Sequence, residues 1–286
     1  MTDSEIPPQP SHESLRSETS DDATTANTAI PNSRMAPSRQ SLAKTHSRDQ
    51  IRERLDQGHR IDYLPDFIYG AIDGTVTTFA VVSGVAGADL SSGIVIVLGL
   101  ANLVGDGFSM AASNYSGTRV EQQLRQRMRS REAYEIETYP EGEREEVRQI
   151  FAGKGFQGEE LETVVRVITS DKERWIDTMM TEEMGIGHSQ RSPIKAAIAT
   201  LAAFVVVGFI PLISFVWQAI SANGLGDAYL SSVILTAIAF FCVGAVKSRF
   251  VDQHWFVSGI ETLALGGSAA SLAYLVGWSL SGLTAG

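Results

Sequence analysis

Apolar stretches alternate with polar ones along this chain, and five of the apolar stretches are long enough to cross a lipid bilayer. A membrane-spanning helix needs roughly 20 mostly apolar residues. Because every backbone polar group must be satisfied inside the lipid, stretches of this length predict helices. The pattern therefore predicts an all-α integral membrane protein with five transmembrane helices, the third of them kinked at Pro211. The predicted spans cover residues 66–88, 92–114, 194–219, 228–247 and 256–281.

The polar stretches divide the 286-residue chain around these spans. Residues 1–60 are rich in Ser, Thr, Pro and charge, so we expect a largely disordered tail there. Residues 61–115 hold the first two spans, and residues 193–286 hold the last three. Between them, residues 116–192 are soluble in character and too long for a simple connection. We therefore expect a three-helix domain inserted between spans two and three.

Positive charge predicts the orientation of the chain in the membrane. Of the 23 Lys and Arg residues, 8 precede the first span, 12 lie between the second and third spans, Lys195 lies at the start of the third, and 2 lie at the boundary between the fourth and fifth. Lys and Arg gather on the cytosolic side of membrane proteins. The N-terminus and the inserted domain should therefore be cytosolic, and the C-terminus should lie on the far side. Without a recognisable eukaryotic sorting signal, the bacterial inner membrane is the default expectation.

Ionisable groups inside the spans are costly, and for that reason they indicate function. Asp73 lies in the first span, Asp106 in the second and Glu261 in the fifth, and Met110 follows Asp106 by one helical turn. At 1.5 Å per residue, all four lie roughly 6–12 Å below the cytosolic surface. This layer predicts an ion site in a transport pathway. The alternative for Asp106 and Glu261 is that they cap helix ends or reach toward water.

The inserted domain is acidic, with 16 Asp and Glu between residues 116 and 192. Two pairs of glutamates are each three residues apart, so each pair projects from one side of a helix. Pro140 and Gly142 interrupt the chain between the pairs, which favours two helices that face each other. The pairs are Glu132 with Glu135 and Glu143 with Glu146.

A third helix is expected over about residues 160–184, and its last turns combine methionine with glutamate. Met179, Met180 and Glu183 can all reach one side of this helix. Because thioethers are poor ligands for Mg²⁺ and Ca²⁺, this mixture predicts a transition-metal site, with Fe²⁺ first and Mn²⁺, Co²⁺ or Zn²⁺ behind it. The single cysteine, Cys242, excludes a CxxC site, and no Glu-x-x-His pair supports a di-iron oxidase. The competing interpretation is a solvated, charged bundle with methionines in its core.

Four motifs give the chain a family resemblance over about residues 62–282. The motifs "GAIDGTVTTFAVVSGVAGA", "GDGFSMAASNY", "WIDTMMTEEMGI" and "IETLALGGSAASLAYLVG" resemble the vacuolar iron transporter family. The resemblance implies five spans, a homodimer, and export of Fe²⁺ from the cytosol in exchange for protons. It places pore residues at Asp73 and Met110. It also implies cytosolic metal ligands at Glu132, Glu135, Glu143, Glu146, Met179, Met180 and Glu183.

One position departs from the family pattern. Many relatives have an acid four residues after the second-span methionine, where this chain has Asn114. A gating or relay role of that acid is therefore absent here or displaced.

The resulting hypothesis is a proton-coupled Fe²⁺ transporter, not an enzyme. It has metal ions and the lipid bilayer as partners, no nucleic acid, and no permanently bound cofactor. Two alternatives stay open: a carrier of Mn²⁺ or of many divalent ions, and a membrane-anchored metal buffer or sensor. An anchored buffer has no need of Asp73, so the acids inside the spans favour transport.

Overall fold

The computed structural model describes residues 38–56, 62–187, 191–221, 226–251 and 253–284. The chain falls into two compact units, residues 1–58 and residues 59–286. In the first unit, where we expected a disordered tail, the described residues form two short helices, α1 (Arg39–Thr45) and α2 (Arg48–Asp56). The rest of that expected tail lies outside the described residues.

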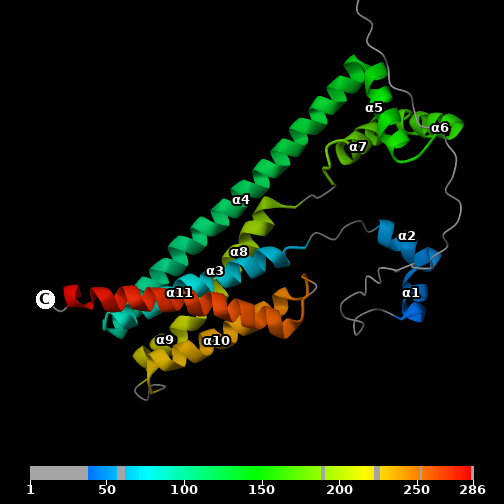
Figure 1. The fold of residues 1–286 in the computed structure, drawn as a ribbon. Coiled ribbons are helices and arrows are strands. Elements are labelled where there is room, and N and C mark those ends of the chain that lie inside the picture. The colour runs from blue at the N-terminus through cyan, green and yellow to red at the C-terminus, as the bar shows by residue number, and fades with distance from the viewer. Residues whose placement is uncertain (1–37, 57–61, 188–190, 222–225, 252, 285–286) are drawn as a thin grey trace, which may run out of the picture. The chain divides into compact units, whose positions relative to one another are not determined.

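Among the described residues, five helical segments are long and apolar enough to cross a membrane, which confirms the predicted number of spans. Helix α3 is central to this group, because α8, α11, α4 and α10 all contact it. Figure 1 shows these helices running side by side, with α4 continuing well beyond them. The spans are α3 (Leu64–Gly87), the first part of α4 (Ser92–Thr138), α8 (Pro193–Gly208) with α9 (Ile213–Ile220), α10 (Ala228–Lys247) and α11 (Trp255–Thr284).

Small residues, Gly70 and Gly74, let α3 approach α8 closely. A Cβ atom at Gly70 would lie 2.3 Å from the carbonyl oxygen of Thr200, and one at Gly74 would lie 2.5 Å from that of Phe204. Neither position could hold a side chain unless the helices moved apart. This contact fixes the part of α3 that carries Asp73.

The third span is broken at Pro211, as predicted. Helix α8 ends at Gly208, a short 3₁₀ turn follows (η1, Ile210–Leu212), and α9 completes the span. Proline cannot donate the hydrogen bond that an α-helix needs at this point. The Ser232 hydroxyl of α10 donates to the Pro211 carbonyl oxygen at 2.6 Å, so this carbonyl at the break has a partner inside the bundle.

Helix α4 differs from the prediction, because the second span and the first helix of the inserted domain form one helix of 47 residues. The stretch that joins them, residues 115–131, is rich in Arg and Gln and contains no proline. Such straight-chain residues lose little freedom in a helix. The helix ends only at Thr138, before Pro140 starts α5 (Pro140–Gly153), so the predicted interruption there is confirmed.

The expected single helix over residues 160–184 is wrong, because the chain forms two helices there. These are α6 (Gly158–Thr169) and α7 (Lys172–Glu182). The break falls at Asp171, whose side chain accepts a hydrogen bond from the backbone N–H of Arg174 at 2.8 Å. This N-cap satisfies a donor that opens α7, and it favours a new start over a continued helix.

The inserted bundle, defined as α4 beyond Thr118 with α5, α6 and α7, has its own apolar core. Helix α7 contacts both α4 and α6, and α5 contacts both α4 and α6. Figure 1 shows these three short helices gathered at the C-terminal end of α4. The buried core residues are Ile136, Val147, Val165, Ile168, Trp175, Ile176, Met179 and Met180.

Candidate functional site

Two glutamates from different helices lie buried against each other in the inserted bundle. Glu132 of α4 is 1% exposed and Glu143 of α5 is 8% exposed. Besides burial, a hydrogen bond between the two carboxyl groups is one of the causes that raise the pKa of Glu132. The other oxygen of each group, Oε1 of Glu132 and Oε2 of Glu143, is buried without a partner. Two buried and unpaired acceptor atoms are costly, and a cation would satisfy both.

Burial and crowding of negative charge raise the pKa values in this cluster. Burial, followed by the Glu143 carboxylate, raises the pKa of Glu132 to about 8. Burial is also the main cause that raises the pKa of Glu143, with Glu146 and Glu135 adding to it. The pKa of Glu183 is raised by burial and then by Glu146 and Glu135. Glu132 therefore keeps its proton near neutral pH, and a divalent cation would compete with that proton.

The structure thus brings together all five glutamates that the sequence predicts as ligands. Glu135 faces its own helix neighbour Arg131 at 3.0 Å, which supplies one positive charge at the rim. Glu146 is exposed and acts on both Glu143 and Glu183. Across the described ranges, however, no three acidic, histidine or cysteine side chains lie close enough to surround one metal ion. Metal binding would need these side chains to rotate inward.

The two predicted methionine ligands lie in the bundle core. Met179 is fully buried and Met180 is 5% exposed, and both pack with Trp175 and Ile176. They also lie within one turn of Glu183, whose N–H donates to the Met179 carbonyl oxygen at 3.0 Å. Both methionines therefore belong to the apolar core and lie next to Glu183 along the chain, and either a packing role or a ligand role fits this place.

In the spans, α3 and α4 bring two of the predicted acids together. Asp73 is half-buried on α3 and lies within electrostatic reach of Asp106 on α4. One turn further along α3, the Thr77 hydroxyl donates to the Asp73 carbonyl oxygen at 2.9 Å. Asn102 of α4 in turn donates to the Thr77 hydroxyl oxygen at 3.2 Å, so polar contacts line this α3–α4 seam.

The other two predicted pathway residues, Met110 and Glu261, have different surroundings from Asp73 and Asp106 at the seam between α3 and α4. Met110 is partly buried and packs against the apolar core of the spans. Glu261 is exposed on α11 and lies 3.5 Å from the ammonium group of Lys247 at the end of α10. This pairing agrees with the alternative that Glu261 reaches toward water near a helix end.

Sequence reasoning missed a buried acid, Asp66, in the first turn of α3. It is 5% exposed and forms an ion pair with Arg191. Its other oxygen accepts a hydrogen bond at 2.9 Å from the side-chain amide of Asn114, which also donates to the Thr200 hydroxyl oxygen at 2.7 Å. Asp66 stands directly before the apolar stretch that begins at Phe67, so its place at a helix start gave the only hint.

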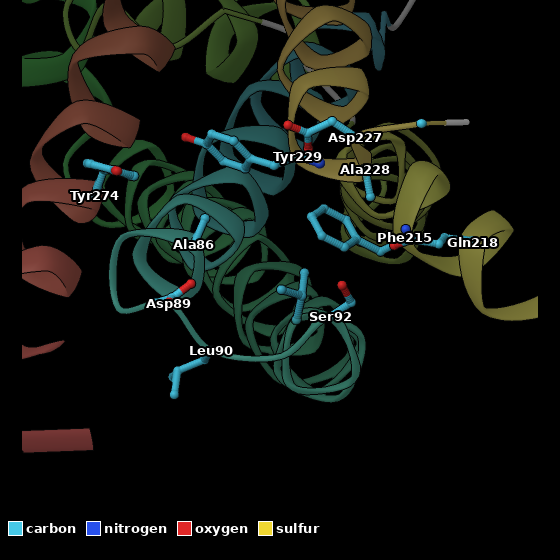
Figure 2. Close-up of a pocket in the computed structure, with 12 residues that line it drawn as sticks. Ala86, Asp89, Leu90, Ser92, Phe215, Gln218, Asp227, Ala228, Tyr229 and Tyr274 are labelled. Carbon is cyan, nitrogen blue, oxygen red and sulfur yellow. Dashed lines mark hydrogen bonds between the residues drawn. The ribbon is translucent and has the colours of Figure 1, made fainter. Parts of the chain in front are cut away.

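At the opposite end of the spans, the structure has a polar cavity of about 360 Å³ (Figure 2). Asp89, Asp227, Gln218 and Tyr229 are among the residues that line it. Asp227 caps α10, accepting hydrogen bonds from the N–H groups of Tyr229 and Leu230 at 2.9 and 3.2 Å. This acid therefore has a structural role, and the cavity contains none of the predicted ligands.

Comparison with known proteins gives a consistent match over the spans and the inserted bundle. The profile of the VIT family matches residues 64–278. A vacuolar iron transporter of Toxoplasma gondii is 34% identical over 247 residues, covering 81% of each chain. Vacuolar iron transporter 1 of Arabidopsis thaliana is 31% identical over 214 residues, covering 74% of this chain and 84% of the relative. Vacuolar iron transporter 1 of Oryza sativa is 30% identical over 233 residues, covering 81% and 90%.

Proposed function

Because the chain belongs to the VIT family, we propose that it moves Fe²⁺ out of the cytosol in exchange for protons. Its relatives are named iron transporters, and this chain is accordingly a multi-pass membrane transporter of metal and not an enzyme. Proton coupling and the role of the inserted bundle are our inference.

The observation that carries the proposal is the cluster of five glutamates from α4, α5 and the end of α7. The pKa of Glu132 is raised to about 8, and Glu132 and Glu143 each have an unpaired buried oxygen. A divalent cation would satisfy these oxygens and release the proton, so the cluster can collect metal from the cytosol. Met179 and Met180 would add sulfur ligands if their side chains turned toward Glu183, which would favour Fe²⁺ over harder ions.

In the spans, we assign to Asp73 the role of coupling metal transport to proton transport. A carboxylate in this layer can hold a metal ion or a proton, but not both at once. Metal arriving from the cytosol would displace a proton, and a proton arriving from an acidic far side would displace the metal. Asp106 and Met110 on α4 would share the site, while Glu261 would contribute from its edge.

We also propose that the protein works as a homodimer. Asp106 is exposed on α4 within one chain, close to the exposed apolar side chains of Val104 and Phe108. A carboxylate facing lipid at this depth is costly. A second copy packed on this face of α4 would remove the carboxylate from lipid.

A wider metal range is the second candidate, and one observation favours it. The methionines lie in the bundle core, so the accessible ligand atoms of the cluster are carboxylate oxygens. Oxygen-only ligation suits Mn²⁺ as well as Fe²⁺. The two candidates differ only in the metal and not in the mechanism.

Uptake into proteoliposomes tests both candidates. The purified protein would be reconstituted, and entry of Fe²⁺, Mn²⁺, Co²⁺ and Zn²⁺ compared with and without an acidic interior. We expect Fe²⁺ entry to depend on the pH gradient and to raise the internal pH. Equal Fe²⁺ entry with and without the gradient would exclude proton exchange. Fe²⁺ binding without any entry would favour the buffer or sensor.

A further inference from the structure

One face of α4 carries polar side chains without interruption from the spans to the glutamate cluster. Its members are three or four residues apart, so they fall within an arc of about 80° around the helix axis. At 1.5 Å per residue, the face is about 27 Å long. This polar face of α4 consists of Asn114, Thr118, Gln122, Arg125, Arg129 and Glu132.

The middle of this face binds the chain that returns from α7 to α8. The Arg125 guanidinium donates to the carbonyl oxygen of Gly187. One turn closer to the spans, the Gln122 side-chain amide donates to the carbonyl oxygen of Arg191 at 2.7 Å. The described residues on both sides of 188–190 are therefore attached to α4, in the order that leads back toward the membrane.

At its membrane end, the returning chain contacts Asp66 at the start of α3, and Asn114 links the same Asp66 to α4 and α8. The Arg191 side chain forms an ion pair with Asp66 of α3, which is 5% exposed. Asn114 of α4 donates to Asp66 at 2.9 Å and to the hydroxyl oxygen of Thr200 on α8 at 2.7 Å. The backbone N–H of the next residue, Ser192, donates to the Tyr63 hydroxyl oxygen at 2.9 Å. Both oxygens of the Asp66 carboxylate are thus satisfied without a metal ion.

At its other end, the same face holds α7. The Arg129 guanidinium pairs with Glu173 and with Asp177, both on α7. The next member of the face is Glu132, which belongs to the glutamate cluster. The polar face therefore joins the spans to the cluster through side-chain contacts, in addition to the continuous backbone of α4.

The amide at Asn114 suits this arrangement better than an acid would. A carboxylate there would place a second negative charge against Asp66 and could not donate a hydrogen bond while ionised. It would also compete for Arg191 or attract a cation. The departure from the family pattern at this position keeps Asp66 available for Arg191.

We propose that Arg191 and Gln122 are positioning residues that hold the glutamate cluster over the cytosolic ends of the spans. The proposal rests on the transport function proposed above. A cluster held close to the pathway releases its metal ions near the pathway entrance. The local concentration of metal at that entrance is therefore high. Loosening the attachment should therefore raise the Fe²⁺ concentration needed for half-maximal transport, and leave the maximal rate unchanged.

Two variants and two controls test the proposal on the full chain. Arg191→Met keeps an unbranched stem but removes the guanidinium group and its charge, and Gln122→Met keeps the length of the side chain but removes the whole amide group. Arg191→Lys should restore most of the wild-type behaviour because it retains the charge. Arg119→Met is the matched control, since Arg119 is exposed on α4 outside the polar face.

Amide hydrogen exchange at Gly187, Arg191 and Ser192 gives a readout that does not depend on transport. Loss of one hydrogen bond is worth about 1 kcal/mol, so Gln122→Met should speed local exchange by up to about tenfold. The KM for Fe²⁺ should rise by a similar factor, with kcat within about twofold of wild type.

Each contrary result points to a different failure. Unchanged exchange in both variants would show that the returning chain is not held by these contacts. Faster exchange with an unchanged KM would show that the contacts are structural only. A wild-type protein that transports no Fe²⁺ would refute the proposed function, while the exchange data would still report on the attachment.

Discussion

At the scale of single residues, the sequence pattern predicted the five glutamates that the structure gathers, because helical spacing and the Pro140 break largely determine their common side. It did not predict Asp66 as a site residue, because its partner Arg191 is 125 residues away. Burial of Met179 also could not be settled from spacing alone. Both a core position and a ligand position require the same helix face.

The sharpest residue test concerns Asp73. Asp73→Asn keeps the size of the side chain and removes its titratable charge, so both Fe²⁺ entry and the linked proton flux should be lost. Both would be followed in acid-loaded vesicles, with a pH-sensitive dye inside. Metal binding to the inserted bundle should survive, and it serves as the control for folding. Normal Fe²⁺ entry with continued loss of the gradient would move the coupling role to Asp106 or Glu261.

The methionines can be tested with substitutions that preserve volume. Met179→Leu with Met180→Leu should cost less than about 1.5 kcal/mol each in stability, yet lower Fe²⁺ affinity more than Mn²⁺ affinity if the sulfurs are ligands. Met184→Leu is the matched control, because Met184 packs on the same core. Calorimetric titration in detergent measures both affinities. Equal affinities in the double variant and in the control would leave the two methionines a packing role only.

The buried carboxyl of Glu132 predicts how the bundle responds to pH. Its pKa is raised to about 8 in the folded chain, so its contribution to stability is complete below its unfolded value of about 4.5 and is lost as the pH rises toward about 8. With a chelator present, exchange protection of α5 and α7 should therefore fall between about pH 5 and pH 8.

Glu132→Gln should remove most of that fall, because the amide remains neutral and can still donate to Glu143. Glu162→Gln is the control, since Arg148 lowers the pKa of the exposed Glu162 and moves its titration below this range. A wild-type protein with the same protection at both ends of the range would contradict the assigned proton.

At the scale of helices, the lengths of the spans follow from hydropathy, but the ends and breaks depend on single polar groups. Pro211 broke the third span as expected, because a missing N–H acts in any environment. Asp171 broke the expected third helix of the inserted domain because its cap outweighed a continuous helical pattern. The uninterrupted α4 was missed because the change from apolar to polar residues near residue 115 shows where the chain leaves the lipid, but not whether the helix continues there.

The close packing of α3 on α8 gives an element-scale prediction. Gly70→Ala would place a methyl group 2.3 Å from the Thr200 carbonyl oxygen, so the helices must separate, at a cost of about 1–3 kcal/mol. Thermal unfolding in detergent should show a lower midpoint, and transport should fall because Asp73 moves with α3. Gly267→Ala is the control: no atom lies within 4 Å of its added methyl group. Equal midpoints for the two variants would contradict the contact.

At the scale of the whole molecule, the distribution of Lys and Arg predicts which ends of the spans share a side of the membrane. In a Cys242→Ala background, single cysteines at exposed Glu159 in the bundle and exposed Ser91 before α4 should lie on opposite sides. A membrane-impermeant maleimide added to intact cells should label Ser91→Cys, and should label Glu159→Cys only after the cells are opened. Labelling of both in intact cells would overturn the predicted topology.

Because α4 has no break between the lipid and the glutamate cluster, a rotation of its membrane part would move its cytosolic end with it as one rigid helix. Tilting its membrane part by about 10° would carry Glu132, about 27 Å beyond Asn114, sideways by about 5 Å. A small rearrangement among the spans is thereby amplified in the soluble part of the protein. Motion should also be transmitted in the other direction. A ligand that binds α5, α6 and α7 and holds them against the end of α4 would restrain the spans without entering the membrane.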